Sequence, residues 1–232
     1  KGVENLNQAV DALQKGEDVK LAFASAPSVA QFVAARVLKQ VRARYAGLFV
    51  DINILKIEET IDYILLERGE FVIMSTPVQN AAVENERIAT GRLVVILPDG
   101  HPLVQKSTVT VQDLANEKLI GVDLNDPYGR LLARPFIEAG LRVTHDMRGR
   151  FAQTVVSLVR HGLGVAVIDE FSVAEVYMPG ITRRAPETDV TIGIHVAKKK
   201  GRVLSGFADY TIQQFRRELG RAIEDGPQLR RK

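Results

Sequence analysis

Short apolar segments alternate along this chain with segments at helical spacing, and this alternation constrains the fold more than any other feature. Residues 19–24 form an apolar run of strand length, and residues 29–44 carry valine and leucine on one helical face. The order repeats with a strand at 48–55, a helix at 58–68 that Gly69 is expected to end, and a strand at 71–74. Strands that alternate with helices usually pair in parallel through right-handed crossovers, so the sequence predicts an α/β fold.

A second cluster of the same kind follows, without a Ser- or Pro-rich linker before it. Strands are expected at 89–97, 118–122, 142–147, 164–168 and 190–196, and helices at 111–115, 127–139, 152–160, 169–176 and 203–219. Segments 91–94 and 191–196 are placed so that the chain could cross from one lobe to the other and back, as in binding proteins that close by hinge motion. We expect lobe I at 18–92 and 194–223, lobe II at 93–193, and a tail at 224–232.

Composition excludes several classes of function. The chain has 31 basic and 28 acidic residues, a balance too slight to indicate nucleic-acid binding. It has no cysteine, hence no disulfide framework, and no apolar run of the ~18 residues that a membrane span needs. Residues 1–18 lack the apolar middle of a secretory signal. These features favour a soluble protein that does not contact the membrane. The lack of cysteine suits a cytoplasmic protein and does not exclude an export compartment.

No motif for catalysis, metal or cofactor binding stands in the sequence. Gly162 and Gly164 precede a predicted strand, whereas the glycines of a dinucleotide fingerprint follow one, and Val167 stands where the third glycine belongs. Gly162 is instead expected to end a helix in the left-handed conformation, and Gly164 to permit close backbone packing. The four histidines lack metal-site spacing, and there is no G-x-S-x-G elbow. We therefore expect no enzyme, no metal and no cofactor.

Three predicted helices begin directly after strands, at residues 25–28, 58–60 and 150–154. Such helix starts present free backbone N–H groups and favour anions. In open α/β sheets, ligands bind beyond the carboxyl ends of the strands, so these segments are expected to meet at one crevice. The alternative is that their Ser and Thr residues serve only as helix caps.

Five segments resemble the effector-binding domain of LysR-type transcriptional regulators, over residues 19–219. They are KLAFAS at 20–25; VL at 37–38 with RARY at 42–45; RLVVILPDGHPL at 92–103; VQDLANEKLI at 111–120; and TVVSLVRHGLGVAVI at 154–168. The combination is more specific than any single segment. One departure is that Val72 stands where the family often has an aspartate before its third strand.

The resemblance implies two Rossmann-like lobes of the type II periplasmic-binding-protein kind, joined by two crossover strands, with a small-molecule effector between them. It implies a homo-oligomer, either a dimer or a tetramer, that meets DNA only through an N-terminal winged helix-turn-helix absent from this chain. The starting Lys1 and the narrow apolar stripe of residues 3–14 are then expected to mark the end of a linker helix at 1–17.

Carried over by position, the resemblance implies a set of effector-binding residues at strand ends and helix starts. They are Ser25, Ala26, Ser28, Glu59, Thr60, Ser75, Thr76, Asp126, Arg150, Phe151, Gln153, Thr154, Asp169 and Glu170. Helix ends suit a carboxylate, and Asp126, Asp169 or Glu170 suits an amino or guanidino group, so an amino-acid-like or carboxylate effector is expected.

Two alternatives share the predicted architecture. An exported solute-binding protein of a transporter has the same two lobes, and some enzymes use the same scaffold, because fold does not determine function. The regulator hypothesis requires that the effector have different affinities for two arrangements of the lobes or subunits, since only differential affinity shifts such an equilibrium.

Overall fold

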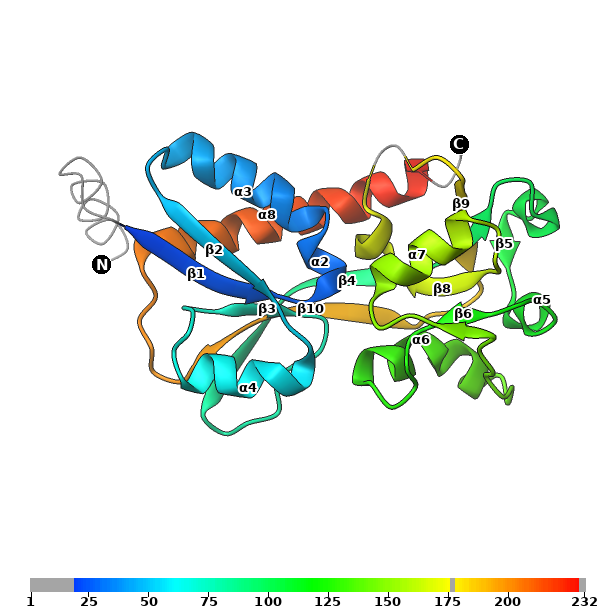
Figure 1. The fold of residues 1–232 in the computed structure, drawn as a ribbon, viewed down its shortest axis with the longest axis horizontal. Coiled ribbons are helices and arrows are strands. Elements are labelled where there is room, and N and C mark those ends of the chain that lie inside the picture. Colours follow the sequence, from blue (N-terminus) through cyan, green and yellow to red (C-terminus); the bar gives the residue numbers. More distant parts are fainter. Residues whose placement is uncertain (1–18, 176–177, 230–232) are drawn as a thin grey trace. The chain divides into compact units, whose positions relative to one another are not determined.

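The computed structural model describes residues 19–175 and 178–229, which form two compact units (Figure 1). Unit 1 comprises the described residues through Ala89 together with Gly193–Gly220, and unit 2 comprises Thr90–Ile192 with the described residues from Arg221 onward. The helix expected at 3–14 lies outside the described residues.

Unit 1 is built on three parallel strands in the order β2-β1-β3. Strand β1 (Lys20–Ser25) pairs with β2 (Phe49–Ile54) on one side and β3 (Val72–Met74) on the other. Strand β10 (Thr191–Lys199) runs antiparallel to β3. Parallel strands require crossover connections, and these are helical, as the alternating pattern predicted.

Helices cover both faces of the unit 1 sheet. Helices α3 (Val33–Arg44) and α8 (Gly206–Leu229) lie on one face and α4 (Ile57–Leu65) on the other, and the short α2 (Pro27–Ala30) follows β1 (Figure 1). Phe23 of β1 stacks on Phe71 with ring centroids 4.9 Å apart and meets Phe215 of α8 edge-to-face at 5.8 Å. These aromatic contacts fix α8 to the sheet.

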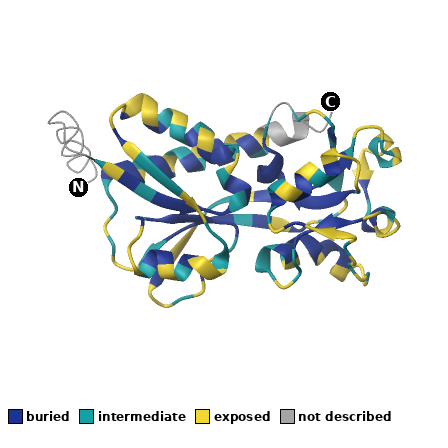
Figure 2. Ribbon diagram, viewed as in Figure 1, coloured by how far each residue is buried: buried dark blue, intermediate teal, exposed yellow. Residues whose placement is uncertain are grey.

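Unit 2 is built on β4 (Val83–Pro98), which pairs antiparallel with β8 (Ala166–Asp169) and β9 (Ile181–Pro186). Strand β5 (Thr108–Val109) adds to β9 in parallel, and β6 (Ile120–Gly121) pairs in parallel with β7 (Met147–Arg148). The helices are α5 (Val111–Ala115), α6 (Pro127–Glu138) and α7 (Ala152–Arg160), with 3-10 turns η1 (Pro102–Gln105) and η2 (Glu170–Val173). Their apolar faces enclose a core that is rich in valine, isoleucine and leucine (Figure 2).

Two strands carry the chain between the units. The unit boundaries fall within β4, between Ala89 and Thr90, and within β10, between Ile192 and Gly193, and a third boundary falls within α8, between Gly220 and Arg221. The fold is therefore α/β, with two Rossmann-like lobes joined by two crossover strands, of the type II periplasmic-binding-protein kind.

Several predicted elements differ from the structure. The expected strand at 142–147 is reduced to the pair Met147–Arg148, because most of the segment is polar and exposed. The helix expected at 169–176 is only the turn Glu170–Val173, and the expected helix at 29–44 begins as α2 and resumes at Val33. The sequence pattern did not predict strand β9, because Arg183 and Arg184 interrupt its apolar residues.

The end of α4 also differs from expectation. The helix ends at Leu65, and Glu67 adopts the left-handed conformation with φ of 52°, a role that had been expected of Gly69. Gly69 serves packing instead, since a Cβ there would lie 2.2 Å from the Tyr63 hydroxyl oxygen. At the other two glycines the predictions are confirmed: Gly162 has φ of 75°, and a Cβ on Gly164 would lie 2.3 Å from the Lys118 carbonyl oxygen.

Candidate functional site

The predicted unit 1 residues gather at the carboxyl ends of β1 and β3. Ser25 ends β1 opposite Ile73 of β3, and the Ala26 amide donates to the Ile73 carbonyl at 2.6 Å. Thr60 of α4 is fully buried, donates to the Lys56 carbonyl at 2.8 Å, and lies 3.7 Å from the Met74 sulfur. The structure thus brings residues of β1, β3 and α4 together at one edge of the sheet, where ligands of α/β sheets bind.

The Ser25 and Ser28 hydroxyl groups at this edge differ in whether they have a hydrogen-bond partner. The Ser25 hydroxyl donates to the Ala26 carbonyl at 3.1 Å. The Ser28 hydroxyl, on α2, is 3% exposed and has no hydrogen-bond partner among the described residues. A buried polar group without a partner costs about 1–3 kcal/mol, so a group that supplies the partner would recover this cost.

The remaining unit 1 residues of the predicted set are Glu59, Ser75 and Thr76. Ser75 is buried and Thr76 half-buried directly after β3. The Glu59 carboxylate accepts from the Lys56 amide at 2.8 Å and so caps the start of α4. Glu59 therefore contributes to the cap of α4.

In unit 2, Asp169 is fully buried and its carboxylate is surrounded by internal donors. It accepts from the amides of Phe171 and Ser172 at 2.9 and 3.0 Å, from the Ser172 hydroxyl at 2.7 Å, and from the Tyr128 hydroxyl. Burial raises the pKa of Asp169 above its ordinary value, and these donors oppose the rise. Both oxygens are engaged within unit 2, so Asp169 holds β8, η2 and α6 together.

No sequence pattern identifies Tyr128 as the partner of Asp169. Burial, and next the Asp169 charge, raise the pKa of Tyr128 well above its ordinary value, so its hydroxyl stays protonated and donates. The available signal was local: Asp126 precedes Pro127 as the N-cap of α6, and its Oδ1 accepts from the Tyr128 amide at 2.8 Å. The cap fixes Tyr128 in the first turn, but its partner lies 41 residues away in sequence.

Glu170 also has an internal structural contact. Its side chain is 3% exposed, and Oε1 accepts from the Arg92 amide of β4 at 2.7 Å and lies 4.0 Å from the Arg92 Nε. The strand approaches closely here, since a Cβ on Gly91 would lie 2.5 Å from the Phe171 ring. Glu170 therefore secures β4 to η2, next to the point where the chain passes between the units.

The predicted residues at the start of α7 are more accessible. Arg150 is exposed, with its guanidinium carbon 5.2 Å from the centre of the Phe151 ring, and Phe151 is the N-cap without a side-chain cap bond. Gln153 is half-buried and Thr154 exposed on the first turn. This set supplies a cation and polar groups beside a helix start.

Residues 19–175 and 178–229 contain neither a metal-binding cluster nor a membrane-spanning helix. No group of three or more His, Cys, Asp or Glu side chains there is arranged to hold a metal ion. No helix in that part of the chain is both long and apolar enough to cross a membrane.

This architecture matches that of a known protein family. The model of the LysR substrate binding domain matches residues 14–221. The chain belongs to the LysR substrate-binding domain family. The family resemblance expected from the five sequence segments is thereby confirmed.

The relatives of this LysR-family domain are transcriptional regulators. It is 25% identical over 185 residues to the transcriptional activator protein LysR of Escherichia coli, covering 79% of this chain and 59% of that protein. It is 25% identical over 188 residues to the RuBisCO operon transcriptional regulator of Allochromatium vinosum, covering 81% and 60%. The chain thus spans about 60% of the length of these relatives.

Solved structures share the fold of this LysR-family domain. HinK, a LysR family transcriptional regulator from Pseudomonas aeruginosa, has a TM-score of 0.75 at 20% identity, over 94% of this chain and 77% of that one. The effector-binding domain of QuiR in complex with shikimate has a TM-score of 0.71 at 14% identity, over 85% and 97%. At these identities the likeness concerns the fold alone.

Proposed function

We propose that this LysR-family domain binds a small organic carboxylate and that binding changes how the domain packs in a homo-oligomer, and so controls transcription. The DNA contact is assigned to a winged helix-turn-helix elsewhere in the whole protein, because this chain itself has nearly balanced charge. The observation that carries the proposal is the Ser28 hydroxyl, which is buried without a partner at the carboxyl edge of the unit 1 sheet.

A carboxylate suits the unit 1 residues for a physical reason. The Ser28 hydroxyl can donate to an oxygen of the ligand, and a hydrogen bond to a charged group contributes about 1.5–3 kcal/mol. Ser25, Ala26, Thr60 and Ser75 surround the same edge without contributing a negative charge. We propose that these five residues contact the effector in unit 1.

The acidic residues predicted to hold an amino group already have structural contacts. Asp126 caps α6, Asp169 accepts four internal hydrogen bonds, and Glu170 secures β4. Of the two effector classes expected from the sequence, this distribution supports the carboxylate over the amino-acid-like molecule. In unit 2 we propose Arg150, Phe151, Gln153 and Thr154 as the contacting set, with the Arg150 guanidinium as the cation.

The alternative of an exported solute-binding protein is less well supported, because the curated relatives named above are transcriptional regulators. The gene's upstream codons distinguish the two: a winged helix-turn-helix favours the regulator, and a secretory signal favours transport. Turnover of any substrate would instead favour an enzyme.

Calorimetry with a panel of small carboxylates, each paired with its uncharged amide, tests the effector class. We expect binding of at least one acid and at least tenfold weaker binding of its amide, since 1.4 kcal/mol corresponds to a factor of about ten. Ser28→Ala should weaken the acid about tenfold. It should leave the free protein at least as stable as before, because the hydroxyl has no protein partner to lose and the cost of burying it is removed.

Ser157→Ala on the exposed face of α7 is the matched control and should change neither property. Light scattering with and without the bound acid then reports the oligomer. If no acid in the panel binds, or if Ser28→Ala and Ser157→Ala behave alike, the proposed unit 1 contact is wrong. If an acid binds but the oligomer is unchanged in mass and dimensions, the proposed coupling is wrong.

A further inference from the structure

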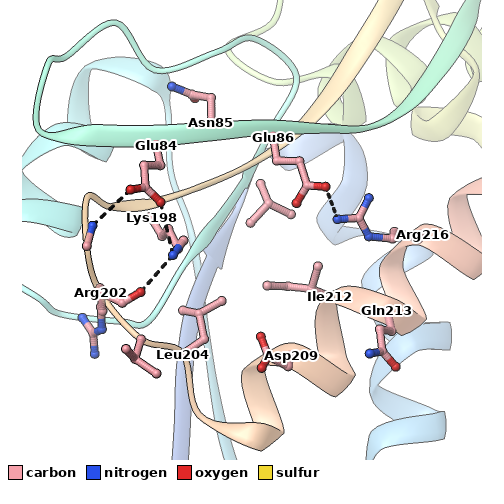
Figure 3. Close-up of a pocket in the computed structure, with 13 residues that line it drawn as sticks. Glu84, Asn85, Glu86, Lys198, Arg202, Leu204, Asp209, Ile212, Gln213 and Arg216 are labelled. Carbon is pink, nitrogen blue, oxygen red and sulfur yellow. Dashed lines mark hydrogen bonds and ion pairs between the residues drawn. The ribbon is translucent and has the colours of Figure 1, made fainter. Parts of the chain in front are cut away.

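A groove of about 910 Å³ lies within unit 1, between α8 and the strands β4 and β10 (Figure 3). We call it the α8 groove. Its strand wall carries Glu84 and Glu86 of β4 and Val196 and Lys198 of β10. Members of each pair are two residues apart and so point to the same face of the sheet. The loop at 201–204 after β10 completes the wall.

The helix wall is one continuous stripe of α8. Asp209, Ile212, Gln213 and Arg216 line the groove at the spacing i, i+3, i+4 and i+7, which is one face of an α-helix. A different stripe of α8, which includes Phe215, enters the core. Helix α8 therefore serves two surfaces, and the stripe that lines the groove leaves a space next to the sheet.

Each cation that lines the groove already has an anionic partner. The Arg216 Nη2 lies 2.6 Å from the Glu86 carboxylate, and the Lys198 Nζ lies 3.2 Å from that of Glu84 (Figure 3). Arg202 lies 3.7 Å from Glu67, which is outside the groove lining. Each of the three cationic side chains in the groove lining is therefore paired with a carboxylate.

Among the three carboxylates that line the groove, Glu84 and Glu86 are in ion pairs and Asp209 is not. No hydrogen bond or ion pair joins its side chain to another described residue, and in Figure 3 no dashed line reaches it. Asp209 is exposed at the groove surface. Partial desolvation and the charge of Glu70 raise the pKa of Asp209, and the charge of Lys198 opposes the rise. The floor beside it is apolar, with Val196 and Ile212 buried and Leu204 half-buried. A bound cation with an apolar body would match both features.

We propose that the α8 groove is a second ligand site, which binds a small organic cation of the ammonium or guanidinium type with a short apolar chain. Asp209 pairs with the cationic head, and Val196, Leu204 and Ile212 contact the chain. The ion pair Glu86–Arg216 links β4 to α8 within the lining of the site.

The α8 groove is separate from the proposed carboxylate site. Strand β10 is antiparallel to β3, with Val196 opposite Ile73 and Ala197 opposite Val72, the first residue of β3. Lys198 and the loop at 201–204 therefore extend past the amino end of β3, whereas Ser75 follows its carboxyl end. The two sites lie at opposite ends of the same strands, so one can fail without the other.

Amide-resolved NMR titration of the full chain with n-butylammonium tests the proposal, with n-butanol and n-butyrate as probes of the same chain length. We expect saturable shifts at Gly201, Leu204 and Gln213, and binding about fivefold tighter for butylammonium than for butanol, as a partly exposed ion pair provides. Butyrate should produce no saturable shift at these amides.

Three variants sharpen the test. Asp209→Asn should weaken butylammonium about fivefold, and Asp62→Asn, which removes an equal charge from the exposed face of α4, should not. Gln213→Lys places a cation four residues after Asp209, the spacing at which helical side chains pair, and should compete with the probe while keeping the fold.

The proposal is overturned if butylammonium shifts none of these amides, or if butanol binds as tightly. It is also overturned if the two aspartate variants have equal effects, since Asp209 would then act only as a negative charge in the first turn of α8. Retained binding in Gln213→Lys would likewise place the cation elsewhere.

Discussion

Tyr128→Phe is the substitution that most directly tests the buried network of unit 2. It removes one hydroxyl that donates to Asp169 and keeps the ring, which packs against the core of the unit. Asp169 is fully buried, so water cannot replace the lost donor. The carboxylate keeps three donors, from the amides of Phe171 and Ser172 and from the Ser172 hydroxyl.

The magnitude follows from the charge of the acceptor. A hydrogen bond to a charged group contributes about 1.5–3 kcal/mol, and the three remaining donors place the loss near the lower end of this range. We expect a loss of about 2 kcal/mol in the free energy of unfolding of unit 2. Tyr210→Phe is the control, because the Tyr210 hydroxyl has no hydrogen bond to any described residue, and a change within about 0.5 kcal/mol is expected.

Urea titration measures the shift in midpoint, with the slope expected to be unchanged. Hydrogen exchange locates the effect, since the Phe171 and Ser172 amides donate to the same carboxylate and should lose protection. Loss of less than about 0.5 kcal/mol in Tyr128→Phe, or unchanged protection of those two amides, would refute the role given to this network.

Two further predictions concern packing and pH. Gly129→Ala in α6 should destabilise the chain, because the added Cβ would lie 2.0 Å from the Asp123 carbonyl oxygen. At Gly220 in α8 an added Cβ meets no atom within 4 Å. Gly220→Ala should therefore raise the free energy of unfolding by about 0.5–1 kcal/mol, as measured by thermal melts. A stabilised Gly129→Ala would show that the loop before α6 moves freely. Burial, followed by the charge of Arg148, lowers the pKa of His145. The unfolded chain therefore binds this proton more readily, and the stability that neutral His145 contributes is present above about pH 6.5 and lost as the pH falls below it. His145→Gln should make stability depend less steeply on pH between about 7 and 5.5, and an unchanged slope in urea titrations would exclude this contribution.

Much of the fold was predictable from local patterns. Helix α7 occupies the predicted residues 152–160 and α5 the predicted 111–115, because each has an apolar stripe at helical spacing and a clear end. Gly162 ends α7 in the left-handed conformation, as glycine at that position indicates. The two crossover strands were predicted over their parts rich in branched apolar residues, at 89–97 and 190–196. Strand β4 begins earlier, at Val83, because its polar and exposed first half carries no apolar pattern.

The candidate site was predictable only in outline. Sequence could place Ser28 and Asp169 beside strand ends, because those positions follow from the strand and helix pattern. It could not tell that the Ser28 hydroxyl is without a partner while the Asp169 carboxylate has four. Partners such as Tyr128 and Arg92 come from segments far away in the chain.

By itself, the sequence determined the alternation of strands and helices, the passage of two strands between the lobes and the resemblance to LysR-type regulators. All three depend on residue spacing, which acts locally along the chain. Tertiary structure decided which polar groups are satisfied and where space is left. The α8 groove exists because one stripe of α8 enters the core while another stripe faces the sheet across a gap. Local residue spacing cannot predict such a gap, because the segments that border it are far apart in the sequence.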